Sequence, residues 1–397
     1  MTHLLALSDY WWGWGNLLFR WLHVVAAMAW IGASFYFIAL DNHLKPPAEP
    51  DDAERGVGGE AWEVHGGGFY RVEKFRVAPK RLPEPLHWFK WEAYTTWLSG
   101  FALFIVVYYV HASTFLVDKS VRDLTSWEAI VISVGGLLLA WVVYDLLCRA
   151  LGGRELLLAA LVFAFVCLSA WGSCELFSAR AAYLQVGAMI GTMMVGNVFF
   201  VIIPAHWELI RAKQPGREPD PRWNVRGKTR SVHNNYLTLP VVFAMLSNHF
   251  PFTYGHAHAW LILVVLMALG ALIRHYFNLH HAGRDVWPIL GVAAVGIVLL
   301  AFLIRPASSP SAAAGPVPSF QQVHLIVQQR CAACHSLKPT LVSAPPLGIV
   351  FDTRQEIESQ ASQIKAMAVD THTMPLGNAT HMTLGERAVL ARWLASR

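Results

Sequence analysis

Long apolar stretches separated by polar connections occupy residues 1–305. A helix needs about 20 apolar residues to cross a hydrocarbon layer of about 30 Å, and eight stretches approach or exceed that length. The pattern predicts an all-α fold, a polytopic membrane bundle of about eight spans with lipid around it. The sixth span is the weakest, because Pro240 interrupts a short run. The predicted spans are Gly15–Leu40, Glu92–Val110, Trp127–Cys148, Glu155–Cys174, Tyr183–Ile203, Tyr236–Asn248, Ala257–Phe277 and Val286–Ile304.

Composition supports a membrane protein and argues against a nucleic-acid partner. The chain is 55% hydrophobic and only 14% charged, which is too apolar for a soluble protein. Its formal net charge of +5 would fit a nucleic-acid partner, but the basic residues lie in loops between the apolar spans. Membrane topology therefore explains the positive charge better than nucleic-acid binding does.

The distribution of Lys and Arg predicts how the bundle is oriented. Nineteen of these residues lie in or beside one set of alternate connections, and four lie in the other set. Connections rich in Lys and Arg stay in the cytoplasm. Both termini are therefore predicted to face the periplasmic side of a bacterial cytoplasmic (inner) membrane.

Residues 319–397 have the pattern of a small separate domain. Ser319–Arg330 and Thr383–Ser396 carry apolar residues at helical spacing, and we expect them to be the first and last helices of a cytochrome c fold, packed on each other. Between them lies Cys331-Ala-Ala-Cys334-His335. This C-x-x-C-H motif is typical of covalent haem c, in which two thiols bind the porphyrin and the histidine binds the iron.

Other interpretations of the motif fit less well. A zinc site needs further Cys or His ligands at a related spacing, and the chain has no second C-x-x-C run. The thioether of Met374 is the predicted sixth iron ligand, because the proline that follows it stiffens the loop holding the sulfur. We expect Met367 and Met382 to be core residues instead. Haem c is attached outside the cytoplasmic membrane, in agreement with the orientation predicted from charge.

The chain is thus predicted to have three parts. Residues 1–305 form the membrane domain and residues 319–397 the cytochrome c domain. Residues 306–318 are rich in Pro, Ala and Ser and form a linker. The linker is either a tether that lets the cytochrome move between an electron donor and an acceptor, or a plain spacer.

Two segments on the predicted cytoplasmic side are more polar than a connection needs. Glu63–Tyr70 contains three consecutive glycines, which indicate a sharp turn or a close backbone approach. Arg226–Tyr236 leads directly into the sixth span. Together they offer cations, amides and aromatic faces for a flat, anionic heterocycle. A solvated loop with a hairpin is the simpler interpretation of the first segment, and neither segment has a nucleotide-binding glycine pattern.

Histidines in or near the predicted spans are candidates for function, because ionisable groups are costly in a bilayer. His23 lies in the first span and could bind the iron of a haem b, with His111, His249, His256 or His258 as partner. A packed, hydrogen-bonded histidine is the alternative. A redox group buried in the bundle would serve as a relay, because a haem c accepts one electron at a time whereas most organic donors lose two.

Four runs resemble a known family in their order along the chain. They are Trp21–Asn42, Gly66–Tyr70, His87–Tyr94 and Thr229–Tyr236, followed by the predicted cytochrome c domain. This order resembles the bacterial membrane-integral urate oxidases over essentially the whole chain. The first run also resembles, more weakly, a membrane protoporphyrinogen oxidase family thought to carry haem b, which favours His23 as a ligand.

The resemblance implies an oxidoreductase that converts urate to 5-hydroxyisourate and passes electrons through its fused haem c to a terminal oxidase or another respiratory-chain acceptor. Urate is a planar monoanion at neutral pH, so its chemistry indicates roles for the two polar segments. The predicted binding residues are Arg230 as a cation, Asn234 and Asn235 as amide partners, and Phe69 and Tyr70 as stacking rings. The predicted base is His233, His65 or Glu92. The alternative is a haem-relay or quinol-linked electron-transfer protein acting on another small reductant.

Overall fold

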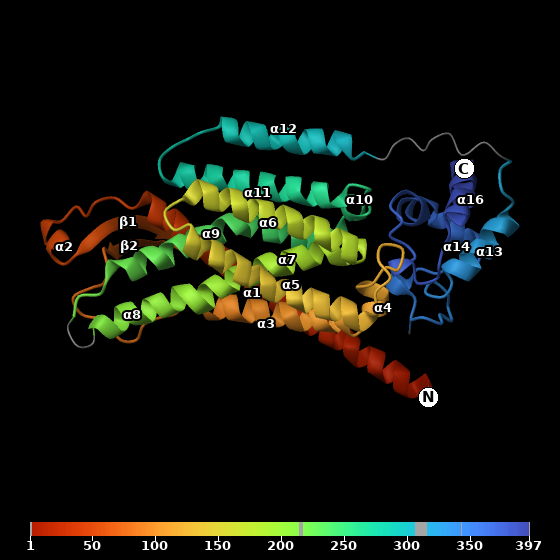
Figure 1. Cartoon of the computed structure of the whole chain (residues 1–397), viewed down its shortest axis with the longest axis horizontal. Coiled ribbons are helices and arrows are strands. Elements are labelled where there is room, and N and C mark those ends of the chain that lie inside the picture. The colour runs from red at the N-terminus through yellow and green to blue at the C-terminus, as the bar shows by residue number, and fades with distance from the viewer. Residues whose placement is uncertain (1, 214–216, 306–315, 343, 397) are drawn as a thin grey trace.

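The computed structural model describes residues 2–213, 217–305, 316–342 and 344–396. These residues form a long helical bundle with a small helical domain at one end (Figure 1), so the expectation of a helical fold is confirmed. The main bundle helices are α1 (Thr2–His43), α3 (Trp91–Phe104), α5 (Ser126–Ala150), α6 (Glu155–Leu176), α7 (Ala179–Asn197), α8 (Ile203–Lys213), α9 (Pro221–Leu246), α11 (Ala259–His281) and α12 (Pro288–Leu303). Short helices α2 (Pro50–Glu54), α4 (Ala112–Phe115) and α10 (Pro251–Tyr254) lie in the connections.

Five helical segments in the described part of the chain are long and apolar enough to cross a membrane. They are α1, α5, α6, α11 and the continuous stretch from α7 through α8. The other three predicted spans also lie on helices, but α12 has only 16 residues and α9 carries many polar residues. Helix α3 has 14 residues and continues as a π-helical turn over Ile105–Tyr109, but it is not among the five segments. At 1.5 Å per residue, α12 is about 24 Å long. The count of eight spans therefore stays a prediction.

The bundle is organised around α7. Its side chains are buried along most of its length by α5, α6, α9 and α11. Tyr183, Val186, Ile190 and Met193 belong to the main apolar core, which also includes residues of the four surrounding helices. Burial of these apolar surfaces against α7 fixes the relative positions of the helices that carry the candidate site.

Residues 57–75 form a β-hairpin, which the all-α prediction did not include. Strands β1 (Val57–His65) and β2 (Gly68–Phe75) are antiparallel. Gly66 and Gly67 make the two-residue turn, with φ of +55° and +82°, the conformation that such turns require. The glycines therefore make the sharp turn that the sequence indicated, in the hairpin that the simpler interpretation of this segment expected.

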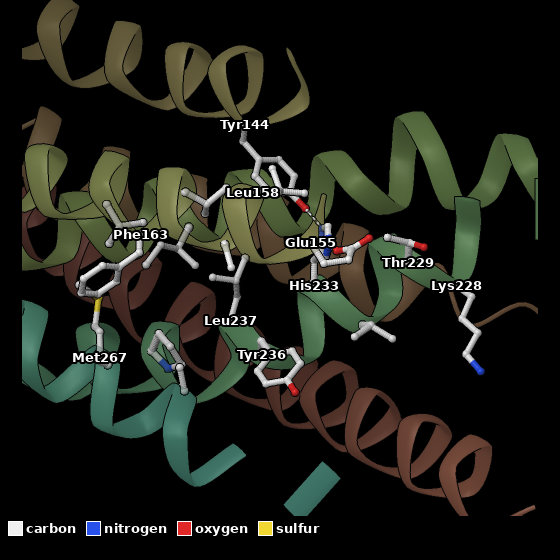
Figure 2. A pocket seen from close by; sticks show the side chains of 18 of the residues that line it. Tyr144, Glu155, Leu158, Phe163, Lys228, Thr229, His233, Tyr236, Leu237 and Met267 are labelled. Atoms are coloured by element: carbon white, nitrogen blue, oxygen red, sulfur yellow. Dashed lines mark hydrogen bonds and ion pairs between the residues drawn. The ribbon is translucent and has the colours of Figure 1, made fainter. Parts of the chain in front are cut away.

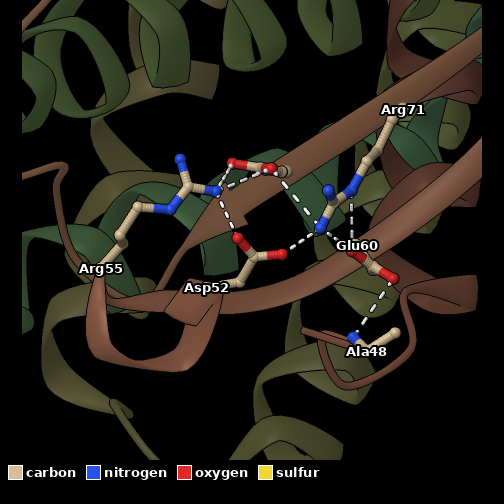
Figure 3. A network of polar contacts seen from close by, with 6 residues as sticks. Ala48, Asp52, Arg55, Glu60 and Arg71 are labelled. Carbon is tan, nitrogen blue, oxygen red and sulfur yellow. Dashed lines mark hydrogen bonds and ion pairs between the residues drawn. The ribbon is translucent and has the colours of Figure 1, made fainter. Parts of the chain in front are cut away.

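A network of charged side chains joins α2 to the hairpin (Figure 3). Arg71 donates through Nε to Glu60 at 2.9 Å and also pairs with Asp52, while Arg55 pairs with Asp52 and with Glu73. Hydrogen bonds from Arg55 and Arg71 hold the pKa of Asp52 below its ordinary value. These contacts hold the hairpin against the connection after α1.

The connections at the two ends of the bundle differ in character. The start of α1, α4, α10 and the C-terminal domain lie at one end, and the hairpin, the end of α8 and the start of α9 lie at the other (Figure 1). The two longest connections rich in Lys and Arg are therefore at the end away from the C-terminal domain. The orientation of the two ends across a membrane stays a prediction.

The C-terminal domain has its own apolar core. Its helices are α13 (Phe320–Arg330), α14 (Arg354–Ser359), α15 (Ala361–Ile364) and α16 (Leu384–Ala395). The two predicted helices are confirmed in α13 and α16, which begin after the capping residues Ser319 and Thr383. They pack on each other, with the rings of Phe320 and Trp393 6.0 Å apart. Residues 306–315 of the predicted linker lie outside the described residues.

Candidate functional site

A chamber of about 670 Å³ lies among α5, α6, α7, α9 and α11. Figure 2 shows that its polar side chains gather at one end, near His233, whereas Phe163 and Met267 lie at the other. The lining consists of Tyr144, Glu155, Leu158, Ala159, Val162, Phe163, Val166, Ile190, Val225, Lys228, Thr229, Val232, His233, Tyr236, Leu237, Pro240, Met267, Ala268 and Ala271. A mostly apolar cavity with a few converging polar groups is the usual form of a small-molecule site.

The spacing of residues along α9 explains which of them reach the chamber. Thr229, Val232, His233, Tyr236 and Leu237 recur every three or four positions and therefore lie on one helical face. That face lines the chamber. The opposite face packs towards α7 and α5, so neighbouring residues of the polar run Arg226–Tyr236 point in different directions.

His233 is the central polar group at this end of the chamber. Its Nδ1 is hydrogen-bonded to the Tyr144 hydroxyl at 2.8 Å, and its Nε2 lies 3.5 Å from Oε2 of Glu155 (Figure 2). The Tyr144 oxygen also accepts a hydrogen bond from Asn197 at 3.0 Å. The side chain of His233 is 19% exposed and that of Glu155 is 64% exposed, so the pair is accessible to a ligand while Tyr144 is buried behind it.

Arg230 and Asn234 use their hydrogen-bonding groups inside the protein. Arg230 donates to Asp145 at 2.7 Å and to Asn197 at 3.0 Å. Asn234 accepts a hydrogen bond from Asn197 at 2.8 Å and donates to the carbonyl of Met194 at 2.9 Å. Arg230 is only 4% exposed, and Asn234 only 5%. The two predicted urate-binding residues thus form a layer behind the chamber, where the Asp145 carboxylate balances the charge of Arg230.

Asn235 belongs to a second buried network, between α9, α11 and α1. Its side-chain oxygen accepts a hydrogen bond from Arg274 at 2.9 Å, and its amide donates to the carbonyl of Ser34 at 3.2 Å. Arg274 also donates to Asn278 at 3.1 Å and lies over the ring of Phe35. Asn235 therefore ties three helices together in this structure.

The remaining predicted urate-site residues lie away from the chamber lining. His65, Phe69 and Tyr70 are exposed on the hairpin, where Phe69 is 79% exposed. Glu92 lies in the first turn of α3. Within the described part of the chain, Oε2 of Glu92 is buried without a hydrogen-bond partner. The structure does not bring these four residues together with His233, and their roles stay predictions.

The three predicted haem b ligands occupy two different regions. His23 packs between α1 and α3, with Nδ1 2.9 Å from the carbonyl of Thr96, and its ring lies against Gly100. His111 precedes α4 and His258 precedes α11, both exposed at the end of the bundle near the C-terminal domain. No group of three or more His, Cys, Asp or Glu side chains among the described residues is placed to hold a metal ion. A haem b on His23 stays a prediction.

The C-x-x-C-H motif forms one tight turn at the end of α13. The amides of Cys334 and His335 donate to the carbonyl of Cys331 at 3.1 and 2.9 Å. Nδ1 of His335 is hydrogen-bonded to the carbonyl of Ile349 at 3.1 Å, which leaves Nε2 for another ligand. Cys331 and Met374 pack against the same apolar core. The attachment of a haem c here, with His335 and Met374 as iron ligands, stays a prediction.

Met382 is buried in the core of the domain, as expected. Met367 accepts a long hydrogen bond from Thr373, with Oγ1 3.6 Å from the sulfur. The carbonyl of Met374 accepts a hydrogen bond from Arg387 at 2.8 Å, and this contact holds the loop that carries Met374 close to α16.

Sequence reasoning missed several residues of the chamber and its supporting layer. Tyr144, Asp145, Glu155 and Asn197 come from three helices other than α9. Tyr144 and Asp145 sit near the end of a predicted span, and an ionisable residue in a span is a signal that could have found Asp145. No local signal marks Glu155 or Asn197, because their roles depend on how α5, α6 and α7 pack.

Comparison with known proteins places the helical bundle in a family. Residues 9–305 match the family described as urate oxidase, N-terminal. This range contains the chamber and ends before the C-terminal domain. No curated protein and no solved structure gives a significant match to the chain.

Proposed function

Because the chain belongs to the urate oxidase N-terminal family, we propose that it is a membrane-bound oxidoreductase that converts urate to 5-hydroxyisourate. In the overall reaction, uric acid and one water give the product, two protons and two electrons. The observation that carries the proposal is the polar end of the chamber, where His233 lies between Tyr144 and Glu155 within the residues that match the family. This arrangement offers a proton acceptor next to a space for a flat ligand.

The residues at the polar end have complementary roles in this proposal. His233 takes the proton that urate loses as charge leaves the ring, and the Glu155 carboxylate, 3.5 Å away, stabilises the imidazolium that forms. Tyr144 fixes the orientation of the imidazole through Nδ1. Lys228 lies at the rim, with its Nζ 3.4 Å from Oδ2 of Asp41, and the ring of Tyr236 offers a face for stacking.

Arg230, Asn234 and Asn235 support this site from behind in the proposal. Their buried hydrogen bonds keep α9 in register with α7, α5 and α11, which sets the position of His233. A direct contact between these residues and urate would require them to exchange protein partners for ligand partners.

In the C-terminal domain, Cys331 and Cys334 would hold haem c, with His335 and Met374 as iron ligands. A bound haem c supplies a one-electron acceptor. We further propose that the protein spans the bacterial inner membrane with both termini outside, and that a terminal oxidase or another respiratory-chain component takes the electrons. A haem b on His23 with His111 or His258 is retained as a hypothesis, which counting b and c haems by their pyridine haemochromes tests.

Anaerobic spectroscopy of the purified full-length protein tests the proposed activity. Addition of urate should reduce a c-type absorption band, with 5-hydroxyisourate appearing in the solution. The His233→Ala variant should show slower reduction by urate and an unchanged oxidised spectrum. A wild-type protein that stays oxidised with urate, but has full haem c content and is reduced by dithionite, would contradict the proposal.

A second candidate function is oxidation of a lipid-soluble quinol. The chamber favours it in one respect, because Leu158, Val162, Phe163 and Met267 make most of its length apolar and urate has no apolar part. The same spectroscopic experiment separates the candidates. Reduction of the c-type band by a short-chain quinol, with no response to urate, would favour the second.

A further inference from the structure

The segment Thr371–Asn378 of the C-terminal domain contacts the helical bundle. Gly377 lies against the backbone of α4 and the residues that follow it, at the carbonyls of Thr114 and Val117. Thr371 lies against Gly255, which directly follows α10. Met374 lies midway between these two contact points along the chain. The contacts with the bundle therefore bracket the predicted iron ligand.

Neither contact leaves room for a side chain at the glycine. A Cβ atom on Gly377 would lie 2.8 Å from the carbonyl oxygen of Val117 and 2.9 Å from that of Thr114. A Cβ atom on Gly255 would lie 2.6 Å from Cβ of Thr371. Gly377 also has a φ of +53°, which favours glycine. The close approach thus depends on one glycine from each side of the contact.

The surfaces that meet are held firmly on both sides. On the bundle side, Ser178 donates its hydroxyl to the carbonyl of Phe115 at 2.6 Å and its amide to that of Leu116 at 2.9 Å. Val117 is only 4% exposed. The segment after His111 is therefore anchored to the start of α7.

On the domain side, buried Arg387 donates to the carbonyls of Met374, at 2.8 Å, and Ala368. Asn378 accepts a hydrogen bond from the amide of Met382 at 2.9 Å. These hydrogen bonds hold the Met374 loop to the rest of the domain.

We infer that Thr371–Asn378 is a docking surface that seats the C-terminal domain on α4 and α10 and holds the Met374 loop against this end of the bundle. The docked arrangement places the loop beside the segments that carry His111 and His258, three residues from Thr114 and Gly255 respectively. Where the proposed function holds, this contact is the place at which electrons leave the bundle. The docking itself is independent of the substrate.

The experiment compares two glycines of the same domain. Gly377 and Gly348 both have positive φ, at +53° and +69°, so alanine strains the backbone at both. Only at Gly377 would the new Cβ meet the bundle, because a Cβ on Gly348 has nothing within 4 Å. Gly348→Ala is therefore the matched control for Gly377→Ala. Gly255→Ala tests the contact from the bundle side without changing the domain, should Gly377→Ala disturb the domain fold.

The first readout is the distance between spin labels introduced as unnatural amino acids at the exposed positions Lys119 and Gln363 of the full-length protein. We expect one narrow distribution for the wild type and Gly348→Ala, and broad, longer distances for Gly377→Ala and Gly255→Ala. The second readout is the rate of c-band reduction by urate, expected to fall about tenfold or more in the latter two variants, with the haem spectrum unchanged.

Narrow wild-type distances in Gly377→Ala and Gly255→Ala would overturn the docking surface, whatever the rates. Broad distances with wild-type rates would show that the loop docks but that electrons leave elsewhere. A wild-type protein that urate does not reduce would refute the proposed function and leave the docking to be judged by the distances alone.

Discussion

Substitutions in the ion pair of Asp145 and Arg230 distinguish a structural role of Arg230 from a role in substrate binding. Both side chains are largely buried, with exposed fractions of 10% and 5%. Asp145→Ala leaves the Arg230 guanidinium buried with Asn197 as its remaining polar side-chain partner. Removing one member of a buried ion pair costs about 3–5 kcal/mol. Arg230→Ala should cost less, because Asp145 keeps its contact with the exposed Arg149 at 2.6 Å.

Thermal unfolding in detergent, followed by tryptophan fluorescence, measures these effects. At about 2–4 °C per kcal/mol, the cost for Asp145→Ala corresponds to a fall in Tm of about 6–20 °C. Arg230→Ala should lower Tm by clearly less. The double variant Asp145→Leu with Arg230→Met is the control, because apolar replacement of a whole buried pair is often neutral or stabilising.

Two results would refute this reasoning. The first is a larger loss of Tm for Arg230→Ala than for Asp145→Ala. The second is an Arg230→Ala protein with wild-type Tm that no longer responds to urate, while Asp145→Ala responds normally. The second result would place the guanidinium of Arg230 on the substrate, as the sequence originally indicated.

Three further predictions concern chemistry and pH. His233→Ala should slow c-band reduction by urate by about 10²- to 10⁴-fold in stopped-flow measurements, and Tyr144→Phe should slow it less, since only the orientation of the ring is lost; unchanged rates would remove both from the site. Replacing Cys331 and Cys334 by Ala should abolish haem that survives denaturing electrophoresis while the protein stays in the membrane fraction, and retained covalent haem would exclude the attachment site. The pKa of Asp52 is lowered in the folded protein. Its ion pairs therefore stabilise the hairpin fully at pH values above about 3.9, the pKa of the carboxyl in the unfolded chain. This stabilisation is lost as the pH falls through the lower pKa of the folded state. The protection factors of the hairpin amides, which are the intrinsic exchange rates at each pH divided by the measured rates, should therefore fall at low pH. Asp52→Asn should reduce the difference in protection between about pH 6 and pH 3.

Much of the fold follows from local patterns in the sequence. The apolar stretches correspond to helices, and the capping residues Ser319 and Thr383 mark the starts of α13 and α16. The glycine run also signalled the turn of the hairpin. The all-α fold class did not include the hairpin, although the simpler interpretation of Glu63–Tyr70 did. The start of β1 at Val57 and the ion pair of Arg71 with Asp52 of α2 depend on tertiary contacts that the sequence pattern does not show.

The candidate site was only partly predictable, and the reason is geometric. The run Arg226–Tyr236 was interpreted as one polar surface. Successive residues of an α-helix are rotated by about 100° about the helix axis. His233 therefore does not face the same neighbouring helices as Arg230, three positions before it, and Asn234, one position after it. His233 faces the chamber, whereas Arg230 and Asn234 face α7 and α5. The partners Tyr144 and Glu155 depend on tertiary packing, which no short motif encodes.

The polar character of α9 has a physical consequence for how the site works. A helix this polar is costly inside a bundle unless its buried groups find partners. Arg230, Asn234 and Asn235 find them on three neighbouring helices. These pairs stabilise the position of α9 and leave the other face free to present His233 and Lys228 to the chamber. Substitutions on the two faces should therefore have different main effects. Those on the inner face should mainly lower the stability of the protein, and those on the chamber face should mainly lower the rate of urate oxidation.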